Sequence, residues 1–350
     1  MEKYFSCMLS GSGCYSAYSV IYKSDPTSRV YIISDGDDLE RAVFFKRLIK
    51  NFRGFGISVF NPFYDDAADG VYIKNTNTYV LSDGGFNRIS PVLPGAWEKY
   101  ISIASPKNYP IQLQREIILH KSREKNFYKI GCEMLKTAST VKDKIHAEIA
   151  DNLDEEKLIG FIRRFCLRTL KSDREMGGGK GTVRLLSSVT PLGLHTHYET
   201  VFDMCEEVTD IRDSTGFVGA VIMGIIRDYA AAEKIPFIMS PAYFSSAIPQ
   251  FLIFPTLGTG VTLSDESHIL PFEPRRTVNA YRFLYENEKS VQTDKIRALI
   301  DIEKKFIDRS VMNVYEGRDK RYKYNALTEG FSSPDKAKKA ADSLSERILT

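Results

Sequence analysis

The stretch VYIISDGDDLERA (residues 30–42) decides the fold, because a short loop of small and acidic residues joins an apolar strand to a helix. The chain repeats this plan as VTDIRDSTGFVGA (208–220). In both copies a strand that ends in proline follows the helix, and a later strand closes on Ser-Asp, at residues 82–83 and 264–265. This order of elements predicts an α/β fold with a mainly parallel sheet in each copy.

The two copies extend over residues 13–91 and 193–271, an offset of about 180 residues. The glycine that opens each copy, the proline and the Ser-Asp pair recur in the same order. Two unrelated α/β halves could share a strand–helix rhythm by chance, but they would rarely share these residues in sequence. We therefore predict an internal duplication in which two parallel-sheet domains superpose over most of residues 30–83 and 208–265, with Ile33 equivalent to Ile211.

The strand–loop–helix layout is that of a P-loop nucleotide-binding domain. The chain resembles the tandem P-loop ATPase-like proteins of bacteria, within the P-loop NTPase superfamily, in which each half carries a Walker A loop. A Thr-Pro-x-Gly segment opens the second half of those proteins, and it stands here at residues 190–193. The resemblance also covers the helical middle and the C-terminal helix. It implies two P-loop domains, each with a site for a nucleotide and Mg²⁺.

The phosphate-binding motif itself is degenerate in both copies. The family pattern places Arg41 where the Lys belongs and Ala42 where the hydroxyl belongs, and the second copy has Gly219 and Ala220 there. A working loop needs the Lys for the β- and γ-phosphates and the hydroxyl for Mg²⁺. The first loop also carries four carboxylates around Gly36. Two like charges ~4 Å apart repel by roughly 4 kcal/mol near a protein surface, so this loop opposes a triphosphate.

What remains is a set of candidate residues for a vestigial nucleotide site. They are Gly36, Arg41 and Asp83 in the first copy, and Arg212, Gly216, Gly219 and Asp265 in the second. The two aspartates stand where a Walker B acid would hold Mg²⁺, but an Asp at a strand end also caps turns. We expect the second loop to be collapsed, with Phe217 or Val218 filling the vacated space. We expect Arg41 to pair with the carboxylates of its own loop.

The sequence assigns no catalytic residue and no metal site. His195 and His197 with Glu199 could hold a metal, but the first copy has Tyr15 and Ala17 at the two His positions and no fourth ligand is apparent.

The sequence therefore predicts a pseudoenzyme, a non-catalytic tandem P-loop NTPase-like protein that acts as a binding or scaffold protein. Its partner would be another protein, or a small ligand in the cleft that holds the nucleotide in the P-loop proteins. The alternative is a nucleotide-dependent ATPase or phosphotransferase with an unorthodox loop that uses Arg41 or Arg212. No cofactor is expected, apart from ATP and Mg²⁺ at a vestigial site.

Composition agrees with two ordinary domains in 350 residues. With 48 basic and 45 acidic residues the net charge is only +3, so no broad polyanion-binding field and no nucleic-acid binding is predicted. The five scattered cysteines fit free thiols in a reducing compartment. No signal-peptide pattern and no apolar run of about 18 residues is present, so we expect a cytoplasmic protein without a membrane span.

The pattern divides the chain into five segments. They are a degenerate P-loop-like domain (1–112), a helical hairpin (113–172), a flexible linker (173–184), a second degenerate domain (185–290) and C-terminal helices (291–350). The linker contains the sequence Gly-Lys-Gly-Thr (residues 179–182), which also occurs in the phosphate-binding loop of some nucleotide kinases. No apolar strand precedes it here, as that motif would require.

The degenerate loops predict that ATP and GTP with Mg²⁺ bind with a Kd above about 1 mM, a binding free energy weaker than roughly −4 kcal/mol. The reason is that the charge and the hydroxyl that anchor a nucleotide are absent. Isothermal titration calorimetry at moderate salt measures this directly. A micromolar Kd that is lost in Arg41→Ala or Asp83→Ala would show instead that the first site still binds nucleotide.

Overall fold

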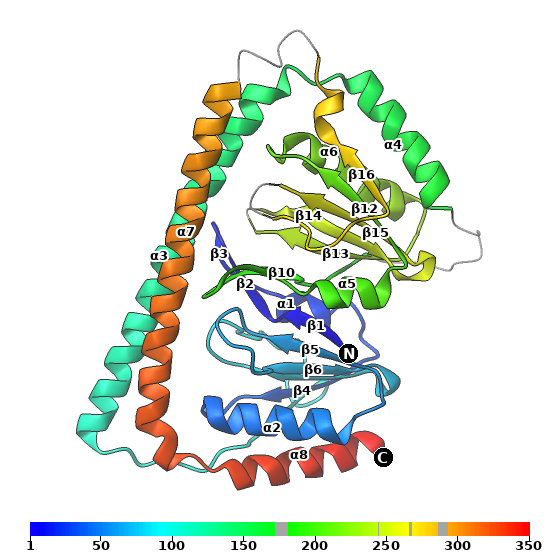
Figure 1. The fold of residues 1–350 in the computed structure, drawn as a ribbon. Coiled ribbons are helices and arrows are strands. Elements are labelled where there is room, and N and C mark those ends of the chain that lie inside the picture. The colour runs from blue at the N-terminus through cyan, green and yellow to red at the C-terminus, as the bar shows by residue number, and fades with distance from the viewer. Residues whose placement is uncertain (172–180, 244, 266–267, 286–292) are drawn as a thin grey trace.

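The computed structural model describes residues 1–171, 181–243, 245–265, 268–285 and 293–350. It consists of two α/β units, one above the other in Figure 1, and two long helices that run along one side of both units. The first unit comprises β1 (Glu2–Phe5), β2 (Cys7–Ser10), β3 (Gly13–Ser16), α1 (Tyr18–Ile21), β4 (Arg29–Ile33), α2 (Asp38–Asn51), β5 (Ile57–Asn61), β6 (Gly70–Ile73), η1 (Lys74–Thr76), β7 (Thr78–Ser82) and β8 (Glu98–Ile101).

The second unit repeats these elements in the same order. It comprises β9 (Gly181–Val183), β10 (Ser187–Thr190), β11 (Gly193–Thr196), α5 (Tyr198–Met204), β12 (Glu207–Arg212), α6 (Phe217–Ala232), β13 (Phe237–Ala242), β14 (Ser245–Phe254), η2 (Pro255–Leu257), β15 (Thr259–Ser264), β16 (Arg276–Asn279) and η3 (Ala280–Phe283). The remaining helices are α3 (Ile111–Ala150), α4 (Glu155–Thr169), α7 (Thr293–Thr328), η5 (Glu329–Phe331) and α8 (Pro334–Leu349).

The two sheets have the same strand order, as a duplication requires. The first is β1-β5-β6-β7-β4-β8 and the second is β9-β13-β14-β15-β12-β16, each strand in the place of its counterpart. In each sheet one strand, β6 or β14, is antiparallel to both neighbours, and the other pairs are parallel. The predicted α/β class with mainly parallel sheets is therefore confirmed, and the shared topology is consistent with two duplicated units.

The strand register corrects the predicted equivalence by one residue. Ile33 of β4 lies opposite Ser82, whereas Arg212 of β12 lies opposite Ser264. If the Ser-Asp ends are aligned, Ile33 therefore corresponds to Arg212 and not to Ile211. The predicted strands and helices are present, but the sequence pattern fixed the register only to within one position.

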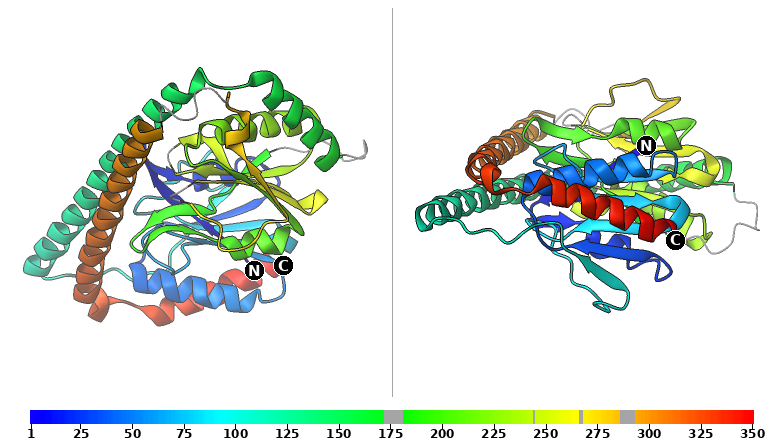
Figure 2. Two further views of the ribbon diagram at one scale, coloured as in Figure 1. Left: turned by 45° about the horizontal axis from the view of Figure 1, so that its top comes forward. Right: turned by 90° about the horizontal axis from the view of Figure 1, so that it is seen from below.

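The helices exchange between the units. After the first unit, α3 crosses to the second, where α4 packs on α6 through an apolar cluster that includes Phe161, Ile162 and Ile222. After the second unit, α7 returns antiparallel to α3, and α8 packs on α2, as both views of Figure 2 show. Each half of the chain thus supplies the last helix of the other unit. The predicted hairpin of residues 113–172 is wrong in this respect, because α3 lies along α7 and not along α4.

The predicted linker also differs from the structure. Residues 173–180 lie outside the described residues, and Gly181–Val183 form β9, which pairs in parallel with β13. A Cβ at Gly181 would lie 2.4 Å from the Phe237 ring, so the close packing of this edge strand favours glycine. The glycine that suggested a flexible linker therefore belongs to a strand.

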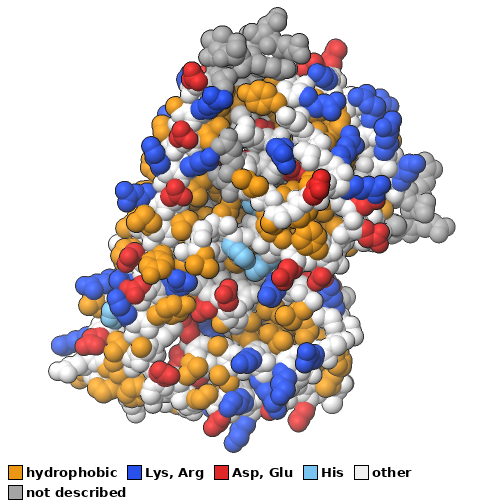
Figure 3. Space-filling model, viewed as in Figure 1, with side chains coloured by type: hydrophobic (Ala, Val, Ile, Leu, Met, Phe, Trp, Pro, Cys, Tyr) orange, Lys and Arg blue, Asp and Glu red, His pale blue; other side chains and the backbone are white. Residues whose placement is uncertain are grey.

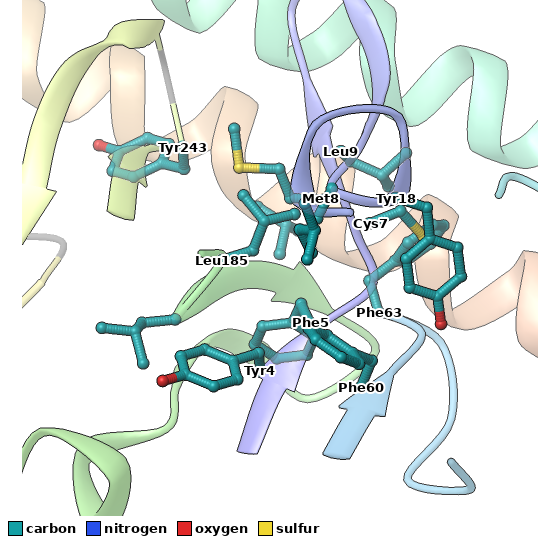
Figure 4. Packing of buried hydrophobic residues seen from close by; sticks show 14 of the residues in the cluster. Tyr4, Phe5, Cys7, Met8, Leu9, Tyr18, Phe60, Phe63, Leu185 and Tyr243 are labelled. Atoms are coloured by element: carbon teal, nitrogen blue, oxygen red, sulfur yellow. The ribbon is translucent and has the colours of Figure 1, made fainter. Parts of the chain in front are cut away.

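One apolar core joins the units at their centre. The two hairpins, β2–β3 and β10–β11, meet there, and Phe5 of β1 donates its backbone N–H to the Leu185 carbonyl (2.7 Å). Figure 4 shows Met8, Leu185 and Tyr243 from both units gathered in this core. All five cysteines are free. Among the described residues, no helix is both long and apolar enough to cross a membrane.

The helix exchange predicts that α8 contributes strongly to stability. Leu344 is 2% exposed, in a cluster with Phe44 and Leu48 of α2, so Leu344→Ala should lower the free energy of unfolding by about 2–5 kcal/mol. Leu349→Ala is the matched control, because Leu349 is 56% exposed on the same helix and its loss should cost less than about 0.5 kcal/mol. Urea denaturation of the full chain compares the two. Equal effects would mean that α8 is not docked in solution.

Candidate functional site

The first loop and its Walker-B-like aspartate meet at one cavity. Gly36, Arg41 and Asp83 all line a cavity of about 1240 Å³ at the carboxyl ends of β4, β7 and β8. Its opposite wall comes from the lower ends of α3 and α7 and from α8 (Figure 1). The carboxyl edge of parallel strands is where open α/β sheets bind ligands.

Charged side chains of both signs line this cavity. The basic ones are Arg41, Arg88, Lys107, Lys121, Lys125, Arg321 and Lys336, and the acidic ones are Asp35, Asp37, Asp38, Asp83 and Glu124. Only Arg41 and Asp83 were singled out as charged candidates from the sequence. Asp35, Asp37 and Asp38 belong to the acidic loop itself, and the remaining charged residues come from segments that are distant in the sequence.

The loop carboxylates are engaged in the local structure. Asp37 caps α2 by accepting from the Glu40 N–H (2.9 Å), while Glu40 accepts from the Asp37 N–H (2.9 Å), so the two form a capping box. Lys107 forms ion pairs with both. Burial alone would raise the pKa of Asp37, but its hydrogen bonds from Lys107 and Ser332 outweigh this and lower it.

The other two carboxylates of the loop are also held. Asp35 accepts from the Ile103 N–H (2.8 Å) and the Ser102 hydroxyl (2.6 Å). Asp38 accepts from Arg321 (2.6 Å) and Asn325 (2.7 Å). The carboxylates of the acidic loop therefore form helix caps and tertiary contacts. Because they are engaged in this way, they repel an anion less strongly than the composition of the loop suggested.

Arg41 does not pair with the carboxylates of its loop, so that expectation is wrong. Its Nε donates to the carbonyl of Asp35 (3.2 Å) and its Nη2 to the carbonyl of Asp83 (3.5 Å). A Cβ at Gly84 would lie 2.7 Å from Nη1, so glycine leaves room for the guanidinium. Within the described ranges Arg41 forms no ion pair, although its charge partly offsets the rise that burial causes in the pKa of the nearby Asp69, and it lines the cavity.

Arg321 reaches the same cavity from α7, in the second half of the chain. Nη1 pairs with Glu124 of α3 (2.9 Å) and Nη2 with Asp38 of α2 (2.6 Å), and the guanidinium lies 4.2 Å from the Tyr64 ring centroid. Arg321 is 7% exposed, and its buried Nε has no hydrogen-bond partner. Because this atom is closed off from solvent, it is a buried donor that the local structure leaves unsatisfied.

The second loop is closed by its own residues. Asp213 accepts from the N–H groups of Thr215 (2.9 Å) and Gly219 (2.8 Å), so a carboxylate sits on the first turn of α6. Gly219 packs so tightly that a Cβ would meet Leu263 at 2.2 Å. Val218 is buried and Phe217 packs against apolar residues of α3 and α7, as expected of a collapsed loop.

A lysine from the first half completes this closure. Lys142 of α3 is 2% exposed and pairs with Asp265 (3.1 Å) and with Glu303 of α7 (3.1 Å). Its Cε lies 2.9 Å from where a Cβ on Gly216 would stand. Burial opposes the charged form, but the surrounding Tyr243, Asp265 and Glu303 keep the pKa of Lys142 well above its usual value.

Of the second-copy candidates, Gly216, Gly219 and Asp265 are close together, and Arg212 is not part of the group. The Arg212 side chain is 64% exposed and its Nε lies 3.6 Å from Asp210. Among the described residues, no group of three or more His, Cys, Asp or Glu side chains could hold a metal ion. Comparison of the chain with protein-family models, curated proteins and solved structures found no match.

The Lys142 triad predicts a strong, pH-dependent effect of its removal. Lys142→Met leaves two buried carboxylates without their cation and should lower the free energy of unfolding by about 3–5 kcal/mol at pH 8. Burial already raises the pKa of Glu303, and loss of Lys142 raises it further. A carboxyl whose pKa is higher in the folded than in the unfolded state stabilises the fold as it takes up a proton, so the loss should shrink toward pH 5.

Lys144→Met is the control, because Lys144 lies on the same helix and is exposed. Urea denaturation at several pH values measures both variants. A small loss, or one that grows on acidification, would mean that Lys142 does not neutralise the two carboxylates.

Proposed function

We propose that the chain is a non-catalytic binding protein whose first unit holds a small anionic ligand beside Arg41, while the second unit is a structural copy. The supporting observation is the charge balance of the first cavity. Lys107 and Arg321 are paired with carboxylates there. In the described part of the chain, Arg41, Arg88, Lys121, Lys125 and Lys336 form no ion pair with a carboxylate of this lining, and only Asp35 and Asp83 of the acidic lining form none with a cation.

Counterpart positions in the two halves support this division of roles. Lys121 and Tyr324 line the first cavity. The aligned strands place the two halves 179 residues apart, so the counterparts of these two residues are Ile300 and Ile145. Both isoleucines are buried in an apolar cluster with Val141. The helix pair thus presents a lysine and a tyrosine to the first loop, and an apolar surface to the second.

The chemistry of the lining favours a phosphoryl group. Guanidinium groups hydrogen-bond phosphate oxygens with directed N–H donors, and lysines add point charges. Arg41 supplies the directed donors, and Lys121 and Lys125, one helical turn apart on α3, supply the point charges. A small phosphorylated compound fits these donors without the Lys and hydroxyl that a nucleotide triphosphate with Mg²⁺ requires.

The second candidate is a nucleotide-dependent ATPase or phosphotransferase, favoured by one observation. Asp69 lines a smaller cavity of about 70 Å³ beside Arg41, and it accepts hydrogen bonds from Tyr18 (2.7 Å), Ser6 (3.0 Å) and Asn87 (2.8 Å). Burial raises its pKa to about 6, a range suited to a general base. ATP turnover by the full chain that Asp69→Asn abolishes would favour this enzyme over the binding protein.

The binding protein predicts that inorganic pyrophosphate binds the full chain, with calorimetry as the measurement. Arg41→Gln should weaken binding by about tenfold or more, because a charge-assisted hydrogen bond in a partly buried site is lost. Arg212→Gln, in the second unit, should leave the affinity unchanged. Absence of pyrophosphate binding, or equal effects of the two substitutions, would contradict the proposal.

A further inference from the structure

Helix α4 lies at the outer edge of the second unit in Figure 1, and its exposed face is strongly basic. Figure 3 shows lysine and arginine side chains gathered over this helix. From Lys157 to its last residue the helix contains no carboxylate. The small net charge of the whole chain gave no sign of this face, because the acidic residues that balance it lie elsewhere.

Two arginines from outside the helix extend the basic surface. The guanidinium groups of Arg276 in β16 and Arg282 in η3 lie 5.6 and 5.7 Å from the ring centroid of Phe161, which α4 carries. The ring is only 6% exposed, so the arginines stand above it at the surface. We call the following six exposed residues the basic face: Lys157, Arg163, Arg164, Arg168, Arg276 and Arg282.

Within the described residues, no member of the basic face forms an ion pair. Other arginines of the second unit do: Arg275 pairs with Glu207, and Arg227 pairs with Asp228 (2.8 Å). Like charges that stand together without carboxylates attract a partner that carries many negative charges.

The internal duplication shows that the basic face is specific to the second unit. The counterpart of α4 in the first unit is α8, where Asp342 takes the place of Arg163 and pairs with Arg47 of α2 (2.7 Å). In the strand register, the counterpart of Arg276 is Glu98, which is buried and accepts from the Val92 and Leu93 N–H groups (2.8 and 2.9 Å). The duplicated fold therefore does not need basic residues at these positions.

Two aliphatic side chains are exposed on the same side of α4. Ile159 is 57% exposed and Leu167 is 54% exposed. Arg163 lies four residues from each of them, so the three side chains share one helix face. The two aliphatic residues are separated by roughly 12 Å along the helix. The face thus combines clustered positive charge with two separate apolar side chains.

This combination favours a lipid surface over the other polyanions. A nucleic-acid backbone would pair with the arginines but would leave Ile159 and Leu167 in water. The core of a protein interface is apolar and depleted of charge, whereas here Arg163 stands between the two aliphatic side chains. At a bilayer surface, anionic headgroups pair with the arginines, and separate apolar side chains enter the boundary of the acyl chains.

We propose that α4 docks the second unit on a membrane surface that contains anionic phospholipid. The basic face contacts the headgroups, and Ile159 and Leu167 insert between them. The surface is independent of the anion cavity in the first unit, because no residue of α4 lines that cavity.

The test is co-sedimentation of the full chain with vesicles of equal parts phosphatidylglycerol and phosphatidylcholine, and with vesicles of phosphatidylcholine alone. The chain should bind the anionic vesicles, and the neutral ones about tenfold more weakly or less. Binding to the anionic vesicles should fall as salt is added, because salt screens exposed charges.

Two arginines of the basic face are replaced to test the charge. Arg163→Gln combined with Arg164→Gln should weaken binding to the anionic vesicles by about tenfold or more, because each arginine adds to the attraction. The matched control is Lys338→Gln combined with Lys339→Gln, which removes the same charge from exposed positions of α8 and should leave binding unchanged.

The apolar contribution is tested separately. Ile159→Ser combined with Leu167→Ser keeps every charge and should also weaken binding by about tenfold or more, because apolar surface no longer leaves water. Its control is Ile118→Ser combined with Leu119→Ser on α3, where the two side chains are 66% and 48% exposed; binding should not change. Circular dichroism verifies that each variant is folded.

Three results would overturn the proposal. The first is no binding to anionic vesicles, or equal binding to neutral ones. The second is a loss that is the same in either pair of α4 substitutions and in its control. The third is binding to a short DNA duplex that is tighter than binding to the vesicles and does not respond to Ile159→Ser with Leu167→Ser, which would assign the basic face to nucleic acid.

Discussion

The antiparallel contact between α3 and α7 is the constraint on which the rest of the molecule depends. The 40-residue α3 is roughly 60 Å long, enough to pass both sheets, and α7 runs beside it for 36 residues. The contact is close: a Cβ at Gly317 of α7 would lie 2.4 Å from the Tyr128 ring of α3. Because each helix starts beside one unit and ends beside the other, the pair fixes the units relative to each other. It also places α4 on the second unit and α8 on the first.

The same helix pair determines the state of both loops. Lys142, Glu303 and Tyr243 surround the second loop, and the residues 179 positions away from them are Arg321, Glu124 and Tyr64, which surround the first. Each loop therefore receives a cation from the helix that belongs to the other half of the chain. A lone unit would lack this cation and would keep the carboxylate that the cation neutralises, so the units depend on each other through charge as well as through apolar packing.

The parts that the sequence predicted well are those set by local pattern. The strands that end at Asn61 and Ser82, their counterparts, and helices α2 and α6 follow from apolar periodicity and from the residues that bound each run. The exchange of α4 and α8 could not be predicted in this way, because an amphipathic helix such as Glu155–Thr169 shows which face it buries but not which sheet covers it. Repeat comparison could have found it, since both halves end in a long helix followed by a short one.

The candidate site shows the same limit in chemical terms. Counting charges in the first loop predicted repulsion of an anion, because the count could not show that Asp37 caps a helix or that Asp38 is paired with Arg321, 283 residues away. The two copies differ in the carboxylate with which the cation from the other half of the chain forms its ion pair. Lys142 pairs with Asp265, at the end of β15, and so lies across the second loop, where Phe217 packs against the apolar cluster that contains Ile145. Arg321 pairs with Asp38 on α2 instead, which leaves Asp83 to accept from the Ile89 N–H (3.0 Å) and keeps the space between β7 and the helix pair open.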